Sequence, residues 1–218
     1  MSKYDTFLNN RKLYISINYN LFMDIKNTFV EALLNRGKIQ SREEILKLVE
    51  NYKNKFQLKF NKDILKYLSR HKYITRVFYG YYYINSFDER TRGFYNLKDH
   101  EIVFMTLNKM KLDWYAGLDY SMYLQGKTWQ TPNQISIINT KFKGDKKIFG
   151  LKVRFFKISN SLLFGLKKKA TSNNIDFLYS DPAKTYIDMV YFKQVRVLKR
   201  VKNTQKYLKS YPKWVGKK

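Results

Sequence analysis

The chain has 218 residues and is 44% hydrophobic, which is enough for a folded core and excludes disorder over most of its length. Lys and Arg total 43 against 17 Asp and Glu, a formal net charge of +26. This charge favours a nucleic acid of some kind, DNA or an RNA such as ribosomal RNA, over an anionic membrane surface. The lack of cysteine excludes disulfides and thiolate zinc sites, and two distant histidines, His71 and His100, offer little to a metal, so we expect no metal and no cofactor.

Residues 1–20 are expected to form an N-terminal arm. They lack the apolar stretch of a secretory signal, and no apolar run in the chain approaches the roughly 18 residues that a membrane helix needs. The sequence therefore predicts a cytoplasmic protein without a membrane partner.

Two helices are predicted next. Apolar residues from Leu21 to Leu34 recur at helical spacing, and Arg36-Gly37 supplies a basic last turn and a stop. Ser41 and Glu44 form a capping-box pattern that opens a second helix through Tyr52. Residues 55–60 then alternate between lysine or glutamine and apolar residues, which predicts a short extended stretch.

A third helix and a hairpin complete this part. Asn61 can cap a helix whose inward stripe is Ile64, Leu65 and Leu68. Two β-rich runs then meet at Tyr79-Gly80, where glycine accepts the positive φ of a tight hairpin. Three helices followed by a hairpin is the order of a winged helix-turn-helix, which we assign to residues 21–86.

The polar side of this segment is almost entirely positive, since residues 53–84 carry eight basic side chains and one acidic one, Asp63. A recognition helix presents long basic or amide side chains to base edges in the major groove, and a wing contacts the flanking backbone. The alternative is an ordinary solvated helix face beside strand tyrosines. As a set, the residues favour DNA; the candidates, which include a basic loop at 141–147, are Lys59, Asn61, Lys62, Lys66, Arg70, Lys72, Arg76, Tyr79, Tyr81, Lys141, Lys143, Lys146 and Lys147.

Residues 87–192 are expected to form a larger α/β domain. The pattern predicts a mostly buried helix over 111–126, strands over 134–139 and 152–158, and a long helix with Asp181 as its cap and Pro182 at its first position. The predicted fold class is α+β: an N-terminal winged helix-turn-helix, this α/β domain, and a basic C-terminal helix.

The order and spacing of several elements over roughly residues 110–192 resemble the C-terminal region of AbiEi-type antitoxins of type IV, abortive-infection toxin-antitoxin systems. The residues concerned are 118–126, 134–140, 149–155, 163–166 and, most specifically, Ser180 to Asp188 with the sequence SDPAKTYID. Departures from the family pattern are a long second helix, Gln125 where many relatives carry histidine, and the basic extension after residue 193.

The resemblance implies a transcriptional repressor that binds operator repeats in double-stranded DNA through its N-terminal domain. It also implies a nucleotidyltransferase-like toxin that is genetically linked rather than tightly bound. On this interpretation the chain is not an enzyme and has no catalytic residues.

Two other functions compete with repression. The 19 tyrosines and 16 phenylalanines could stack on unpaired bases of an RNA that the protein binds or processes. A metal-dependent nuclease uses carboxylates and a lysine to hold magnesium and activate water, and the chain offers such groups at Asp176, Asp181, Lys184 and Asp188. Asp181, however, is better explained as a helix cap.

Residues 193–218 hold ten Lys or Arg and no acidic residue. They are expected either to continue the preceding helix, with Trp214 anchoring its end, or to form an arm that folds on a polyanion. In both cases we expect a second DNA contact here.

Overall fold

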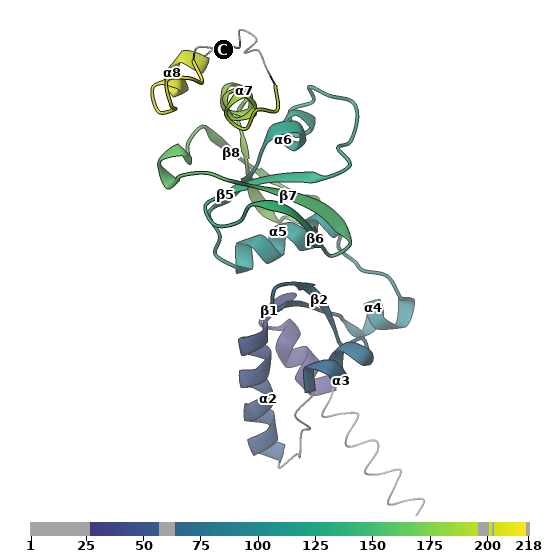
Figure 1. Ribbon diagram of the computed structural model, residues 1–218. Coiled ribbons are helices and arrows are strands. Elements are labelled where there is room, and N and C mark those ends of the chain that lie inside the picture. Colours follow the sequence, from purple (N-terminus) through teal and green to yellow (C-terminus); the bar gives the residue numbers. More distant parts are fainter. Residues whose placement is uncertain (1–26, 57–63, 196–200, 202, 217–218) are drawn as a thin grey trace, which may run out of the picture. The chain divides into compact units, whose positions relative to one another are not determined.

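The computed structural model describes residues 27–56, 64–195, 201 and 203–216. The chain divides into two compact units, Met1–Asn96 (unit 1) and Leu97–Lys218 (unit 2), and each is described by itself. The division falls ten residues later than the boundary expected after residue 86, because the helix that follows the hairpin is bonded to unit 1. The fold is mixed α+β, with a small antiparallel sheet first and a larger mixed sheet second (Figure 1).

Unit 1 combines helices with a three-stranded antiparallel sheet. Residues 27–34 are helical, and the elements after them are β1 (Ile39–Ser41), α2 (Arg42–Phe56), α3 (Ile64–Arg70), β2 (Ile74–Phe78), β3 (Tyr81–Ile84) and α4 (Phe87–Arg92). The strand order is β1-β3-β2, with Ile39 opposite Tyr83 and Ile74 opposite Ile84. The short β1 was not predicted, because three residues are too few to show an alternating pattern.

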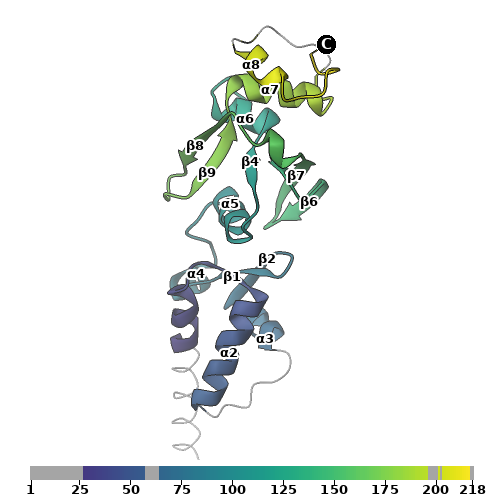
Figure 2. The same ribbon diagram turned by 90° about the vertical axis from the view of Figure 1, so that its left-hand side faces the viewer.

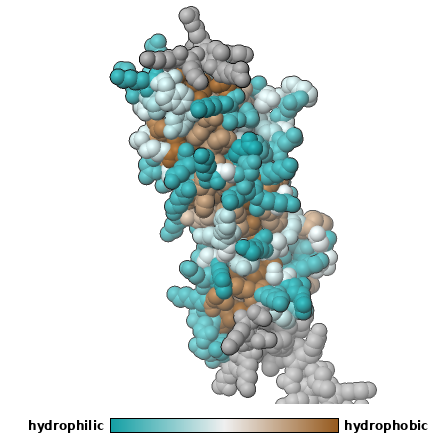
Figure 3. Space-filling view, viewed as in Figure 1, coloured by the Kyte–Doolittle hydropathy of each residue, from teal (hydrophilic) through white to brown (hydrophobic). Residues whose placement is uncertain are grey.

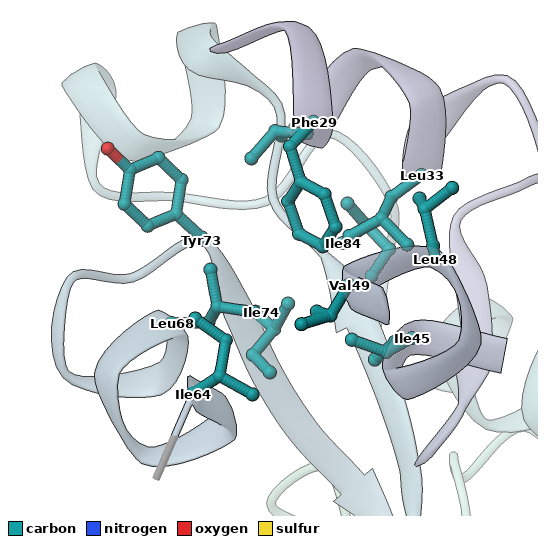
Figure 4. Packing of buried hydrophobic residues seen from close by; sticks show 11 residues of the cluster. Phe29, Leu33, Ile45, Leu48, Val49, Ile64, Leu68, Tyr73, Ile74 and Ile84 are labelled. Atoms are coloured by element: carbon teal, nitrogen blue, oxygen red, sulfur yellow. The ribbon is translucent and has the colours of Figure 1, made fainter. Parts of the chain in front are cut away.

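The core of unit 1 lies between the helices and the sheet. Phe29 and Leu33 of the first helix meet α2, α3 and the strands in one apolar cluster, and Leu33, Ile45 and Ile84 are fully buried (Figure 4). The predicted capping box is confirmed, since the Ser41 N–H donates to Glu44 Oε2 at 2.8 Å and the Glu44 N–H donates to Ser41 Oγ at 3.2 Å. The predicted stop at Gly37 is confirmed by its φ of +111°.

The extended stretch predicted over 55–60 is wrong at its start, because α2 runs through Phe56. The helix continues one turn further than the apolar pattern showed, since lysine and asparagine are tolerated on its exposed side. The rest of that stretch, and the cap predicted at Asn61, lie outside the described residues.

Unit 2 is built on a six-stranded mixed sheet in the order β6-β7-β5-β4-β9-β8. Strands β5 and β7 are parallel, as are β4 and β9, and the other neighbours are antiparallel. The elements are α5 (Asp99–Lys109), β4 (Trp114–Ala116), α6 (Leu118–Leu124), β5 (Ile135–Asn139), β6 (Gly144–Ile148), β7 (Leu151–Lys157), the 3-10 helix η1 (Asn160–Leu162), β8 (Leu166–Ala170), β9 (Asp176–Ser180), α7 (Pro182–Tyr191) and α8 (Thr204–Leu208).

Helices cover both faces of this sheet (Figure 2). On β4, Trp114 packs against Phe104 of α5, whereas the next residue, Tyr115, donates its hydroxyl hydrogen bond to Asp188 of α7 at 2.8 Å. Successive side chains of a strand point to opposite faces, so α5 lies on one face and α7 on the other. Helix α6 packs beside α7 over β5.

Three expectations for unit 2 can be compared with the structure. The helix predicted over 111–126 is wrong in its first half, which contains strand β4, and the helix itself begins at Leu118. Gly117 lies between the two, at a position that accepts only glycine because a Cβ there would lie 2.4 Å from Ile138 Cδ1. The basic loop predicted at 141–147 is wrong for most of its length, which is strand β6 paired with β7. The strands predicted over 134–139 and 152–158 are confirmed within a residue of each end.

The C-terminal segment is part of the core of unit 2. Helix α7 ends at Tyr191, so the prediction that it continues into the basic extension is wrong, and the described residues of that extension contain the short α8 instead. Tyr211 and Val215 are buried among residues of α7. In the part of the chain that the structure describes, no helix has both the length and the apolar character needed to cross a bilayer.

Candidate nucleic-acid interface

Helix α3 has one apolar and one basic side. Ile64 and Leu68 are buried in the core of unit 1, while Lys66, Ser69 and Arg70 are exposed. Residues four apart lie on the same side of a helix and residues two apart lie on nearly opposite sides, so Lys66 and Arg70 share the side that faces away from the core. The helix therefore displays two long cations to solvent from a rigid base.

The end of α3 is closed by a Schellman motif. Lys72 takes the left-handed conformation with φ +57° and donates its N–H to the Ser69 carbonyl at 3.1 Å, and Tyr73 donates to the Leu68 carbonyl at 2.8 Å. The Asn85 side-chain amide then donates to the Lys72 carbonyl at 2.7 Å. Lys72 is exposed and its backbone is fixed beside α3.

Strands β2 and β3 form the predicted hairpin. Phe78 pairs with Tyr81 across a two-residue turn, in which Tyr79 and Gly80 both have positive φ, +23° and +80°. Tyr79 at the tip is 54% exposed, and Arg76 is exposed on β2. The Gly80 carbonyl accepts a hydrogen bond from the Arg42 N–H at 2.7 Å, which ties the tip to the start of α2.

A buried carboxylate, that of Glu89, joins helix α4 to strand β3 of the hairpin. Glu89 of α4 accepts hydrogen bonds from Lys38 Nζ at 2.6 Å, from the Tyr83 hydroxyl and from the Asn96 N–H at 3.0 Å. Burial alone would raise the pKa of Glu89, but these bonds and those from Ser86 outweigh it and lower the pKa to about 2. Glu89 is therefore ionised and fixes α4 and β3 together.

The structure places the predicted residues in two groups and leaves three undescribed. One residue of the first group, Tyr81, is half-buried on β3 of unit 1. The others are exposed on α3, on the turn after it and on the hairpin: Lys66, Arg70, Lys72, Arg76 and Tyr79. Lys141, Lys143, Lys146 and Lys147 belong to unit 2, before and along β6. Lys59, Asn61 and Lys62 lie outside the described residues.

Sequence reasoning missed Arg42. It is exposed at the start of α2 and joined through its backbone to the hairpin tip. The available signal was a long basic side chain directly after the cap Ser41, at the start of the predicted helix. Figure 3 shows one side of each unit, on which hydrophilic side chains are widely spread with apolar patches between them.

The four residues that could serve a nuclease form ion pairs or a helix cap within unit 2. Lys184 and Asp188 are fully buried and form an ion pair at 2.8 Å, and Asp181 caps α7 by accepting from the Lys184 N–H at 2.8 Å. Asp176 is exposed and pairs with Lys168 at 2.6 Å. Among the described residues, no group of three or more His, Asp or Glu is arranged to hold a metal ion.

Comparison of the chain with protein-family models and with curated proteins finds no match.

Proposed function

We propose that the protein binds double-stranded DNA through unit 1, which acts as a winged helix-turn-helix with α3 as recognition helix and the β2–β3 hairpin as wing. The observation that carries the proposal is the joint display of Lys66, Arg70, Lys72 and Arg76, all exposed, on a helix and hairpin that share one core. Residues 64–84 contain no Asp or Glu, so no acidic side chain of this segment opposes a phosphate backbone.

Helix α3 and the β2–β3 hairpin carry the hydrogen-bond donors and positive charges that recognition of a DNA duplex needs. Lys66 and Arg70 lie four residues apart on the exposed side of α3, where long donors can reach base edges or phosphates in a major groove. Arg76 and the exposed ring of Tyr79 suit the flanking backbone or a minor groove. The hydrogen bonds of Asn85 and Glu89 keep this surface rigid before DNA arrives.

With the resemblance to AbiEi-type antitoxins, this surface supports a repressor that binds operator repeats near its own gene in the cytoplasm. A linked nucleotidyltransferase-like toxin would be the partner gene. On this proposal the chain binds and regulates, and performs no catalysis.

The test is retention of a duplex from the region upstream of the gene in a gel-shift assay at physiological salt. The double variant Lys66→Glu and Arg70→Glu should weaken binding at least about tenfold, because two positive contacts become repulsive. For the wild type, the slope of log affinity against log salt should be steeper than for the variant by about two.

The matched control is Lys167→Glu with Lys169→Glu, which changes the net charge by the same amount on exposed residues of β8 in unit 2. Duplex binding of this control should stay within about twofold of wild type. Equal losses in both double variants would show that net charge alone attracts DNA and would remove α3 from the proposal.

A further inference from the structure

Unit 2 contains a groove that the proposed function does not use. It lies beside α7, on the face of the sheet that α7 covers, and has a volume of about 720 Å³. Phe156 of β7 is on one side, and Tyr191, Phe192, Pro212 and Trp214 of the C-terminal part are on the other. This volume is within the range of roughly 300–1,000 Å³ that small-ligand sites occupy.

The walls of the groove are planar aromatic rings. Tyr191 and Trp214 stack, with ring centroids 6.0 Å apart and planes 16° apart, and Phe156 and Phe192 meet at 4.9 Å. Trp214 remains 38% exposed at the groove. The rings contact one another and hold one another in place, so the exposed part of Trp214 offers a preformed surface to a flat apolar group.

The rim of the groove is cationic. Lys143 and Lys157 are exposed at the groove, and Lys213 is exposed next to Trp214. The acidic residue on the rim, Asp145, is occupied by Arg154, which donates to its two oxygens at 2.6 and 2.9 Å. Exposed cations therefore lie beside the aromatic walls, and the carboxylate on the rim is already paired with Arg154.

We propose that this groove binds single-stranded nucleic acid, with an unpaired base stacked on the Trp214 and Phe192 side and the adjoining phosphates held by Lys143 and Lys157. A base has the flat shape that the rings accept, and its phosphates carry the charge that the rim attracts. Bases of an intact duplex are stacked on one another and cannot enter a concave site, so the ligand is a single strand or a loop.

An acidic peptide is the competing ligand and suits the groove less well. It would satisfy the lysines, but it offers no flat group for the stacked rings unless an aromatic residue is placed beside its acids. Every nucleotide combines a flat ring with an anionic phosphate. The groove belongs to unit 2 alone, so this inference is independent of the duplex-binding proposal for unit 1.

The test is fluorescence anisotropy of a labelled twelve-nucleotide oligo(U), with the full chain at physiological salt. The variant Lys143→Glu with Lys157→Glu should bind at least about tenfold more weakly, and Trp214→Ala about tenfold more weakly, while Trp214→Phe should stay within about threefold. If Trp214→Ala melts below the assay temperature, the lysine variant and Trp214→Phe still decide the question.

Two controls match these changes. Lys167→Glu with Lys169→Glu makes the same charge change on β8, and Trp129→Ala removes a tryptophan that is 89% exposed outside the groove. Both should bind oligo(U) within about twofold of wild type.

Equal weakening by the groove variants and the controls would overturn the proposal in favour of a diffuse electrostatic attraction. Competition by a twelve-residue polyglutamate peptide as strong as that by unlabelled oligo(U) would overturn it in favour of an acidic peptide. The variant Lys66→Glu with Arg70→Glu separates the two proposals, since it should lose the duplex and keep the single strand.

Discussion

At Glu89, one buried carboxylate joins the segment before β1, strand β3 and helix α4. Its two oxygens accept five hydrogen bonds, from Lys38 Nζ, the Tyr83 hydroxyl, the Asn96 N–H, and the N–H and hydroxyl of Ser86. We predict that Glu89→Gln destabilises unit 1 by about 2 kcal/mol, because an amide must turn donor hydrogens toward groups that are themselves donors. Asp88→Asn, which breaks an exposed ion pair with Arg92, should cost less than about 0.5 kcal/mol.

The tryptophans make this measurement specific to one unit. Trp114, Trp129 and Trp214 all belong to unit 2, so in Glu89→Gln the circular-dichroism melt should show an earlier transition while the tryptophan transition is unchanged. A shift of both transitions together would mean that Glu89 does not act within unit 1 alone.

The same carboxylate predicts a pH dependence. The folded pKa of Glu89, about 2, lies below its ordinary value of 4.5, so its contribution to stability is fully present above about pH 4.5 and is lost as the pH falls towards 2. The stability difference between wild type and Glu89→Gln should therefore shrink over this range. A difference that stays constant from about pH 5 to about pH 2.5 would contradict the ionised, hydrogen-bonded state.

At the scale of elements, the C-terminal segment acts as part of the core. The Tyr211 hydroxyl contacts both Lys184 Nζ and Asp188 Oδ1, and Tyr207 donates to Asp181 at 2.6 Å. We predict that deleting residues 204–218 destabilises unit 2 by several kcal/mol, since it removes the buried Tyr211 and Val215 and leaves the Lys184–Asp188 pair without the hydroxyl that contacts both of its members.

The thermal unfolding transition of unit 2 can be followed by the fluorescence of Trp114, because this residue stays in the shortened chain and is buried. The control Lys206→Gln with Lys209→Gln removes two exposed cations of the same segment and should melt like wild type. An unchanged melt after the deletion would show that the segment is an appended arm, as its composition alone suggested.

The elements that the sequence predicted well have strong local signals. The capping box at Ser41, the hairpin at Tyr79-Gly80 and the Asp181-Pro182 helix start depend on neighbouring residues, so they can be found without tertiary contacts. Strands β1 and β4 have three residues each and depend on partners far along the chain. For the same reason the groove in unit 2 could not be foreseen: Phe156 and Trp214 come to line one groove only through the parallel pairing of β5 with β7 and the return of the C-terminal segment.

For the whole molecule, the excess of positive charge is visible at the edges of the larger sheet. The two edge strands of the six-stranded sheet are lysine-rich, with Lys146 and Lys147 on β6 and Lys167 to Lys169 on β8. Charged edges hinder pairing with another chain, since two such strands would repel. The cost is self-repulsion within the fold, because 43 cations face 17 anions.

This imbalance predicts opposite effects of salt on folding and on binding. Raising NaCl from about 0.01 M to about 0.15 M shortens the Debye length from about 30 Å to about 8 Å, which screens repulsion among exposed lysines. The melting temperature of the free protein should therefore rise by at least about 3 °C, whereas affinity for duplex DNA and for oligo(U) should fall steeply. Because the buried Lys184–Asp188 pair and Glu89 are shielded from ions, they should not offset the rise. A melting temperature that falls with salt would mean that surface ion pairs such as Arg154–Asp145 outweigh the net repulsion.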